Sequence, residues 1–559
     1  MASLLPYSGT LGSRLSKHLL KRATYNVTKS RIDTFSNYTV DQALTELFVI
    51  PLKNLNQPIH YVNSGLTSPS PWINDDPVYG SVNDNNGSGQ IKRNNYLAGW
   101  WMDEAKRDTS LRSKMTYFLF TDFTASIRTL DNSFHYDYLQ LLEFFCLGDW
   151  KEFCFQMSKN NVMLKYLNND ENTDANPNEN FAREILELFI IGKGPQVAIG
   201  DYTNYTESDV EQAARTLTGW TYTKNNRGLF TNGVDFGDIP CGYAQADKHD
   251  FGAKQFSNRF GNYEIPAWDT TGKTDAEKEA RIGAELKEFL NMVLSQEETA
   301  KFICRKMYRF FVSRTISAEI ENDIIVPLSA TFRTNYNLGE TITELLKSQH
   351  FYDADDSDNS DEIIGGLIKS PLDLVLQTLS LTDFPVPDAI TNGQHHYKNF
   401  YYFSILNKIL VPSGQDPFRP PSVAGFPPTY EAPDFDKFWF NSSTIISRYN
   451  MADILLDSGR IKTTFYVSKF VRENVSNPSN PTVLVNELTD LMFPESIGPE
   501  RRNYFLNDIL LDNGSLTMEM WTDEWMTYVN SGYSNTSGVE AALIPLFEAL
   551  TWSQEYQNN

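Results

Sequence analysis

Hydrophobic residues recur at helical spacing over most of the chain, and they predict a mainly α-helical protein. Apolar positions at i, i+3, i+4 and i+7 mark one face of a helix. This spacing begins in the segment 11–23, continues through 96–128 and 134–167, and returns in 274–312, 372–381 and 438–557. We therefore expect a multi-helical globular protein with long loops, in which strands are confined to short β-hairpins around residues 221–268.

The segment 178–191 has the densest apolar pattern and predicts a buried helix. Apolar residues cover almost its whole circumference, which is typical of a helix with no solvent face. A polar stripe nevertheless follows one side, formed by Asn180, Arg183, Glu184 and Glu187. This spacing stacks the four side chains, so we expect Arg183 to reach Glu187. Gly192 and Gly194 are expected to end the helix.

A second helix is predicted to begin after Thr206, because Asp209 follows three residues later as in a capping box. Thr39 and Gln42 give the same signal earlier in the chain. Arg215 lies in the apolar run of the second helix, so it must reach either water or a carboxylate. The nearest candidates are Glu184 and Glu187. Two alternatives stay open: a stripe of solvated ion pairs, or a buried network in which Arg183→Ala and Arg215→Ala each destabilise by about 3–5 kcal/mol.

Three segments break the helical pattern. Residues 51–90 predict a long loop, and residues 221–268 predict an irregular insert rich in Gly, Asn and Asp. The acidic run 353–362 lacks the ligand register of an EF-hand, which favours a solvated turn over a calcium loop. We expect residues 1–385 to form a main helical core that includes the insert, and residues 386–559 to form a C-terminal helical part of the same unit.

Composition excludes some classes of partner. The chain has 559 residues, of which 41% are hydrophobic, a globular composition, and its 71 acidic against 48 basic residues give a net charge of -23. This charge repels phosphate backbones, so no nucleic-acid partner is expected. The four cysteines show no C-x-x-C spacing, which indicates reduced thiols and no zinc motif. No apolar run is long enough for a membrane span, and the N-terminus lacks the apolar core of a signal peptide, so the chain as written predicts a cytoplasmic protein.

Eight motifs, in order, carry a resemblance to one family. They are HLLKRATYNVT, MLKYLNNDENTDANPNENFAREILELFIIGKG, NYTESDVEQAARTLTGW, KHDFGAK, TAKFICRKMYRFFV, IKSPLDLVLQTL, QDPFRPPSVAGFP and FWFNSSTIISR. Together they resemble the uncharacterised bacterial family DUF1800, of which this chain looks like a divergent member. The resemblance carries no settled activity. It implies a secreted or envelope location if the protein is exported, a sulfatase-like partner protein, and a shared task on extracellular glycans.

The family pattern marks a set of polar positions that could form a site. In an enzyme acting on an anionic or polar carbohydrate, as a hydrolase or lyase, acid–base chemistry would fall to His249, Asp250, Glu184 and Glu187. Substrate binding would fall to His18, Arg22, Asn180, Arg183, Arg215, Trp220 and Lys254. The alternative is a non-catalytic scaffold or binding protein in which the same cluster is structural. No cofactor is expected under either alternative.

The chain departs from the family pattern at three histidines. Where members usually show Trp-His-Asn-His-Phe, residues 119–123 read Leu-Phe-Thr-Asp-Phe, and a third family histidine appears as Gln296. We therefore predict no tightly bound transition metal. A metal site built from His18, His249, Asp250 and Glu184 would need ligands from separate segments to converge. The lost histidines favour the scaffold, whereas a cleft that holds the polar cluster beneath the segment 51–90 would favour the enzyme.

Overall fold

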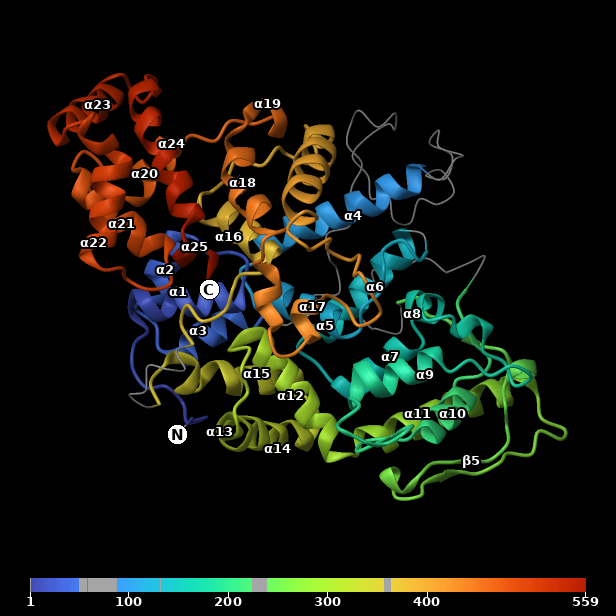
Figure 1. The fold of residues 1–559 in the computed structure, drawn as a ribbon. Coiled ribbons are helices and arrows are strands. Elements are labelled where there is room, and N and C mark those ends of the chain that lie inside the picture. Colours follow the sequence, from blue (N-terminus) through green and yellow to red (C-terminus); the bar gives the residue numbers. More distant parts are fainter. Residues whose placement is uncertain (1, 50–57, 59–87, 131, 224–238, 356–362) are drawn as a thin grey trace.

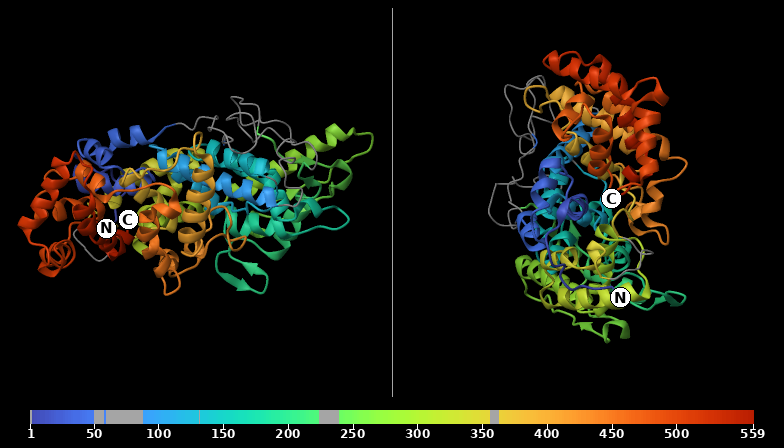
Figure 2. Two further views of the ribbon diagram at one scale, coloured as in Figure 1. Left: turned by 90° about the horizontal axis from the view of Figure 1, so that it is seen from above. Right: turned by 90° about the vertical axis from the view of Figure 1, so that its left-hand side faces the viewer.

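The helices form one elongated body, with the C-terminal helices at one end and a group of helices and hairpins from the middle of the chain at the other (Figures 1 and 2). The structure is a computed structural model that describes residues 2–49, 58, 88–130, 132–223, 239–355 and 363–559. Helices make up most of these residues, so the predicted mainly helical fold is confirmed. The predicted loop 51–90 lies outside the described residues as far as residue 87, apart from residue 58, and a helix begins at Ser88.

The first half of the chain supplies helices along most of the body, from α1–α3 beside the C-terminal helices to α9 and α10 at the opposite end (Figure 1). They are α1 (Gly12–Ala23), α2 (Lys29–Phe35), α3 (Val40–Leu47), α4 (Ser88–Arg107), α5 (Arg112–Asp122), α6 (Asn132–Phe145), α7 (Trp150–Ser158), α8 (Asn161–Tyr166), η2 (Asn169–Glu171), α9 (Asn180–Glu184), η3 (Ile185–Ile190), α10 (Glu207–Thr216), η5 (Ala246–Lys248) and η6 (Asn258–Phe260). The capping boxes predicted at Thr39 and Thr206 are both confirmed, because each threonine and its third neighbour exchange two hydrogen bonds.

The second half continues with two long helices and then shorter ones. They are α11 (Asp275–Leu294), α12 (Glu297–Phe311), α13 (Ala318–Ile320), η7 (Glu321–Ile325), α14 (Val326–Asn335), α15 (Leu338–Lys347), η8 (His350–Tyr352), α16 (Pro371–Leu381), η9 (Gln394–Leu410), α17 (Pro427–Tyr430), η10 (Phe435–Trp439), α18 (Ile445–Leu456), α19 (Ser458–Ile461), α20 (Val467–Asn474), α21 (Pro481–Met492), α22 (Pro499–Asn503), η11 (Tyr504–Leu510), η12 (Asp512–Gly514), α23 (Met518–Asn530), α24 (Ser537–Trp552) and α25 (Gln554–Gln557). The division at residue 385 stays a prediction.

Within the described residues, the strands form three two-stranded antiparallel pairs. They are β1 (Gln196–Ala198) with β2 (Asp201–Tyr202), β3 (Trp220–Thr221) with β4 (Tyr243–Ala244), and β5 (Lys254–Gln255) with β6 (Glu264–Ile265). The expectation that strands occur only around residues 221–268 is wrong for β1–β2. That hairpin forms because Gly200, at φ +69°, takes the left-handed conformation that a tight turn requires.

The predicted helix 178–191 is buried as expected, but it is not one regular α-helix. The α-helical turn α9 ends at Glu184 and continues as the π-helical turn η3, with Ile185 and Phe189 fully buried. Gly192, at φ +76°, ends the helix as predicted. A π-helical turn holds more residues than an α-helical turn. Side chains after Glu184 are therefore rotated away from the face that α-helical spacing predicts.

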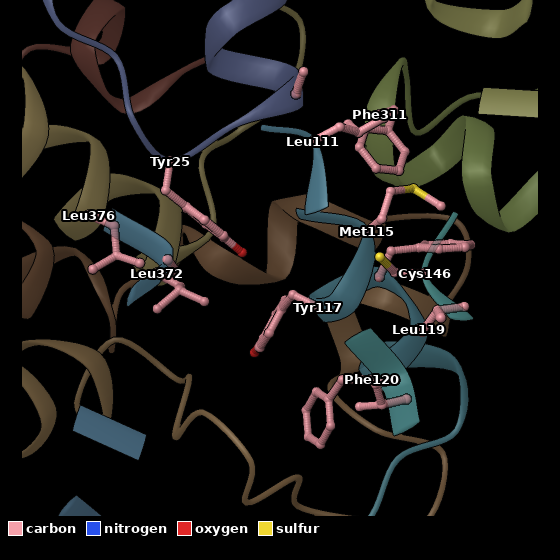
Figure 3. Close-up of a cluster of buried hydrophobic side chains, with 14 of the residues drawn as sticks. Tyr25, Leu111, Met115, Tyr117, Leu119, Phe120, Cys146, Phe311, Leu372 and Leu376 are labelled. Carbon is pink, nitrogen blue, oxygen red and sulfur yellow. The ribbon is translucent and has the colours of Figure 1, made fainter. Parts of the chain in front are cut away.

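Helix α5 is buried on all sides and separates two packing environments. On one side Met115 and Leu119 lie with Phe311 and Cys146 in the hydrophobic core (Figure 3). On the other, the ring of Tyr117 extends toward the space that Tyr25 also faces (Figure 3). The second side leads to the candidate site.

Candidate functional site

A cavity of about 420 Å³ lies in the middle of the body, between α5, α12, the start of α16 and the segment 424–439. Its wall includes six cationic side chains, from Arg22, Lys114, Lys193, Lys306, Arg309 and Arg314, and four carboxylates, from Asp122, Glu187, Asp373 and Asp436. Between them stand aromatic rings, among them Tyr117, Phe302, Phe310, Tyr430 and Trp439. A concave space lined by aromatic rings and charged groups is a usual form of a small-molecule site.

Two helices supply most of this wall through helical spacing. Residues 114, 118, 121 and 122 of α5 and residues 302, 306, 309 and 310 of α12 all line the cavity. Positions three and four apart share one face of a helix, so each helix turns one face to the cavity and packs the other into the core.

Four of the six cations are neutralised within the wall. The pairs are Lys114 with Asp373, Lys306 with Asp122, Lys193 with Glu187 at 2.6 Å, and Arg314 with Asp436 at 2.5 Å. Within the described part of the chain, Arg22 and Arg309 have no such carboxylate partner. Counted over the side chains that the structure describes, the cavity wall therefore carries two more positive than negative charges, in a protein whose net charge is -23.

Arg22, near the end of α1, is the more deeply buried of these two cations, with 3% of its surface exposed. Its Nη2 donates a 2.8 Å hydrogen bond to the carbonyl oxygen of Ile363, whereas Nε and Nη1 have no partner among the described residues. Burial lowers the pKa of Arg22 to about 10, against the opposing effect of Asp436 and Asp373. Arg22 is therefore a cation at neutral pH with donors left unsatisfied, an arrangement that is costly without an acceptor.

Arg309 occupies another part of the same wall. Its guanidinium carbon lies 4.6 Å from the ring centroid of Phe435, and its Nε is buried without a partner among the described residues. Burial lowers the pKa of this guanidinium. An arginine stacked on a ring has a fixed orientation, so its free nitrogens point in a defined direction.

Two buried lysines, Lys21 and Lys369, lie near Arg22. Lys21 donates to the carbonyl oxygen of Met492 at 2.9 Å, and Lys369 donates to that of Tyr556 at 2.7 Å. Burial lowers the pKa of Lys369 to about 7 and that of Lys21 well below its usual value, and each lysine also lies close enough to other cations to be affected by them. These shifts favour the neutral amines, so the positive charge on this side of the cavity comes from Arg22, whose pKa of about 10 lies above neutral pH.

Of the predicted site residues, Arg22 and Glu187 line the cavity. His18 is buried beside Arg22, with Nε2 2.9 Å from the carbonyl oxygen of Phe351. The side-chain amide of Asn180 donates to the carbonyl oxygen of Leu167, and Trp220 is buried at the start of β3. The structure thus brings two of the eleven predicted residues to one accessible space.

A second polar cluster, which we call the Glu285 network, lies at the far end of the body. Lys254 Nζ and His249 Nε2 lie 2.6 Å and 3.1 Å from Glu285 Oε2, and all three side chains are 0% exposed. Arg281 Nε lies 3.2 Å from the other oxygen of Glu285. His249 Nδ1 lies 2.8 Å from the carbonyl oxygen of Thr218, so both of its ring nitrogens are engaged.

The sequence did not identify Glu285 as a partner of His249, because Glu285 lies on α11, far along the chain from the motif that contains His249. A signal was present. Glu285 is three residues after Ile282 and four before Phe289, both buried, so it is an acid on the apolar face of its helix. Asp250, predicted to act with His249, instead accepts a 2.7 Å bond from Arg215 Nε and one from the backbone of Gly252.

The predicted contacts of the two arginines are wrong. Arg183 pairs with Glu179 at 2.8 Å and Glu207 at 2.7 Å, and Arg215 pairs with Asp250 and Gln212, so neither reaches Glu184 or Glu187. The π-helical turn after Glu184 removes the i, i+4 alignment of Arg183 with Glu187. Burial, assisted by Glu187, raises the pKa of Glu184 to about 7.

These contacts change the expected effect of Arg183→Ala. The Arg183 side chain is 30% exposed, and its partners are about 40% exposed. Because exposed pairs contribute little, we expect the variant to lower the free energy of unfolding by no more than about 1 kcal/mol, well below the value for a buried pair. Urea denaturation of wild type and variant measures the difference. A loss above about 3 kcal/mol would contradict the solvated arrangement.

The described residues contain neither a metal-ion cluster nor a membrane-spanning helix. There, no three His, Cys, Asp or Glu side chains are grouped to hold a metal ion, and His18 and His249 have different partners in different elements. Across the same residues, no helix combines the length and apolar character needed to cross a membrane.

The positions that depart from the family pattern have different environments. Asp122 and Thr121 line the cavity, whereas Phe120 is buried in the core with its ring 4.9 Å from that of Phe418. Gln296 is the N-cap residue of α12.

The cavity is lined by residues from separate sequence motifs, namely Arg22, Glu187, Phe302, Lys306, Asp373 and Ala424. Each of these residues belongs to one of the motifs that carry the family resemblance. This common feature was the sequence signal that could have grouped them.

Comparison with known proteins gives one match. The model of a family described as "Protein of unknown function (DUF1800)" matches residues 18–547, nearly the whole chain. Neither a curated protein nor a solved structure matches.

Proposed function

Because the chain belongs to the DUF1800 family, whose description gives no activity, we propose its function from the cavity itself: it binds an anionic carbohydrate. The observation that carries this proposal is that the buried guanidinium of Arg22 and the half-buried guanidinium of Arg309 lack a carboxylate partner among the described residues. A carboxylate or sulfate group would supply the missing acceptors. Charge-assisted hydrogen bonds of this kind are among the stronger polar contacts in proteins.

The electrostatics of the site support an anion. Among the described side chains of the cavity wall, two cations are in excess over the carboxylates, and one of them, Arg22, is deeply buried. In an enclosed space, such charges act more strongly than at the protein surface. The negative charge of the whole protein would repel a bulk anion, so selectivity has to come from the cavity.

The aromatic wall supports a carbohydrate as the carrier of the anionic group. Tyr117, Phe302, Phe310, Tyr430 and Trp439 line the same space. Aromatic rings offer flat apolar faces to the C–H surfaces of a sugar, while the hydroxyl and indole groups of Tyr and Trp keep polar contacts. A uronic acid or a sulfated sugar combines both requirements. Hydrolase- or lyase-like activity, and a sulfatase-like partner that shares the same class of substrate, are part of this proposal.

A scaffold role is the second candidate, and the Glu285 network favours it. Its His249, Lys254 and Glu285 side chains have no exposed surface, so none of them meets a ligand in this conformation. We propose that this network is architectural. The two proposals are compatible, because the network and the cavity occupy different parts of the body.

The binding proposal is tested with Arg309→Gln and a matched control on the same helix, Lys301→Gln. Both remove one charge, but Lys301 pairs with Glu297 and does not line the cavity. Calorimetric titration would use tetrasaccharides that contain uronic acid or sulfate, with maltotetraose as the neutral control. We expect Arg309→Gln to weaken acidic-sugar binding by about 10- to 100-fold, the effect of losing a charged hydrogen bond, and Lys301→Gln to leave it unchanged.

Two results would end the binding proposal. One is equal affinity of wild type and Arg309→Gln for every acidic tetrasaccharide. The other is no binding of any acidic tetrasaccharide by wild type. Inorganic sulfate in the same titration separates recognition of the anionic group from recognition of the sugar.

A further inference from the structure

We propose that a groove at the C-terminal end of the body is a docking site for a basic amphipathic helix of a partner protein. The groove has a volume of about 880 Å³ and lies between η11, η12, α23 and α24, in the group of helices at one end of Figure 1. It is separate from the central cavity, because no described residue lines both spaces. The inference does not depend on the proposed function.

The floor of the groove is apolar and is formed by small side chains of α24. These side chains recur at three- and four-residue intervals, which places them on one face of the helix. They belong to Gly538, Ala541, Ala542, Pro545 and Ala549. Ile509 and Leu516 supply larger apolar side chains, from η11 and from the segment before α23. A second helix could therefore approach the backbone of α24 closely and bury its own apolar side chains there.

Two features of α24 favour a cation in the groove. Pro545 has no N–H, so the carbonyl oxygen of Ala541 lacks the donor that an α-helix normally supplies four residues later. Trp552 lines the groove at the C-terminal end of α24 and is 38% exposed. Its indole nitrogen donates a 2.7 Å hydrogen bond to the carbonyl oxygen of Tyr449, which fixes the ring. The face of a tryptophan ring attracts lysine and arginine side chains.

The charged groups of the groove are almost all acidic. Four carboxylates line it, one from each of η11, η12, α23 and α24, and they belong to Asp508, Asp512, Glu524 and Glu548. Arg501 is the only cation among the described lining residues, and Glu555 neutralises it at 3.0 Å. Within the part of the chain that the structure describes, the first three carboxylates form no ion pair. The groove is therefore complementary to a positively charged partner.

The fourth carboxylate, Glu548, has a like charge beside it. Burial and the neighbouring Asp453 of α18 raise the pKa of Glu548. Two carboxylates that act on each other in this way are stabilised in their ionised forms when a cation binds near them. A lysine or arginine of a docked helix would supply that cation.

The walls of the groove favour a helix over an extended peptide. The described lining residues come from helices and the segments between them, so none of them offers a strand edge for backbone pairing. An extended peptide would leave its own N–H and C=O groups unpaired against the apolar floor. A helix satisfies its backbone internally, so it can place apolar side chains on the floor and basic side chains beside the four carboxylates.

Charge argues against a second copy of this chain as the occupant. Each copy has a net charge of -23, so two copies repel each other. The basic helix α1 is not available for such a contact, because Lys17, Lys21 and Arg22 are buried within the fold. The occupant is therefore a helix of a different, basic protein.

The test uses the full chain and a phage-displayed library of helix-forming peptides as long as α24, which has 16 residues. Selection on wild type should enrich peptides with apolar residues at helical spacing, flanked by lysine or arginine. Synthetic copies are then titrated by fluorescence anisotropy. We expect Glu524→Lys to weaken their binding by about 10-fold or more, and Ala541→Trp to have at least the same effect because its ring fills the floor. The matched control, Asp523→Lys, reverses the charge of the neighbouring exposed residue, which does not line the groove, and should keep wild-type affinity.

Thermal melting checks that each variant folds, as expected for changes at the exposed positions of Glu524 and Ala541. If Ala541→Trp is unfolded, Ala541→Leu tests the same steric block. The inference is overturned if no helical peptide is enriched, if the enriched peptides lack basic residues, or if folded Glu524→Lys binds them as tightly as wild type. A wild-type dimer in sedimentation velocity that Glu524→Lys dissociates would identify a second copy as the occupant and would also overturn it.

Discussion

Replacement of Glu285 by alanine is expected to lower the free energy of unfolding by about 3–5 kcal/mol, the largest effect of any single change considered for this protein. Glu285 is fully buried and is the carboxylate that Lys254 and Arg281 share. The contacts with His249 and Lys254 hold the pKa of Glu285 below its usual range, although burial acts in the opposite direction. Removal of the carboxylate would leave the buried charge of Lys254 without its counter-charge.

Chemical denaturation at neutral pH measures this effect. The matched control is Glu279→Ala, which removes an exposed carboxylate from the same helix and should change stability by less than about 0.5 kcal/mol. The double variant Glu285→Met with Lys254→Met should be more stable than Glu285→Ala, because apolar side chains can replace a buried pair without leaving a charge. A Glu285→Ala variant with wild-type stability would show that the network does not hold the fold together.

Local features of the fold could be predicted from the sequence because their causes lie within a few residues. The capping boxes at Thr39 and Thr206 depend on a partner three positions away, and both are present. Gly192 ended its helix as expected. The mainly helical character follows from apolar spacing of the same local kind. The exception was the π-helical turn η3, which the spacing of apolar residues does not reveal. Because of this turn, Arg183 pairs with Glu179 and not with the predicted Glu187.

The candidate site could be predicted only in part, because it is built from contacts between distant segments. Arg22 and Glu187 were singled out by their motifs, and both line the cavity. The spacing of α12 shows that Lys306 and Arg309 share a face, but not that this face meets α5. Nor does the sequence show that Arg22 lacks a carboxylate partner among the described residues, which depends on where Ile363 and Asp436 lie. Charge balance inside a cavity is a property of the tertiary structure.

Lys369→Met provides the second large effect on stability, and the size of this effect depends on pH. Lys369 is 1% exposed, donates to the carbonyl oxygen of Tyr556, and lies 4.0 Å from the centre of the Tyr556 ring. Burial lowers its pKa from 10.5 to about 7, with Lys114 and Arg448 acting in the same direction and Asp373 against it. A lysine whose pKa is lower in the folded state opposes folding, because the unfolded chain binds the proton more tightly.

The size of the stability change in Lys369→Met, and its dependence on pH, follow from this difference in proton binding between the folded and unfolded states. Between pH 7 and pH 10.5 the unfolded chain carries the proton and folded Lys369 does not, so wild-type stability gains about 1.4 kcal/mol per pH unit from this group. We expect Lys369→Met to be more stable than wild type by about 3 kcal/mol at pH 7, after the lost bond to Tyr556 is subtracted. The advantage should shrink as pH rises toward 9. Urea denaturation at several pH values, with the exposed Lys469→Met as control, measures the difference. A constant difference across this range would show that Lys369 keeps its ordinary pKa in the folded protein.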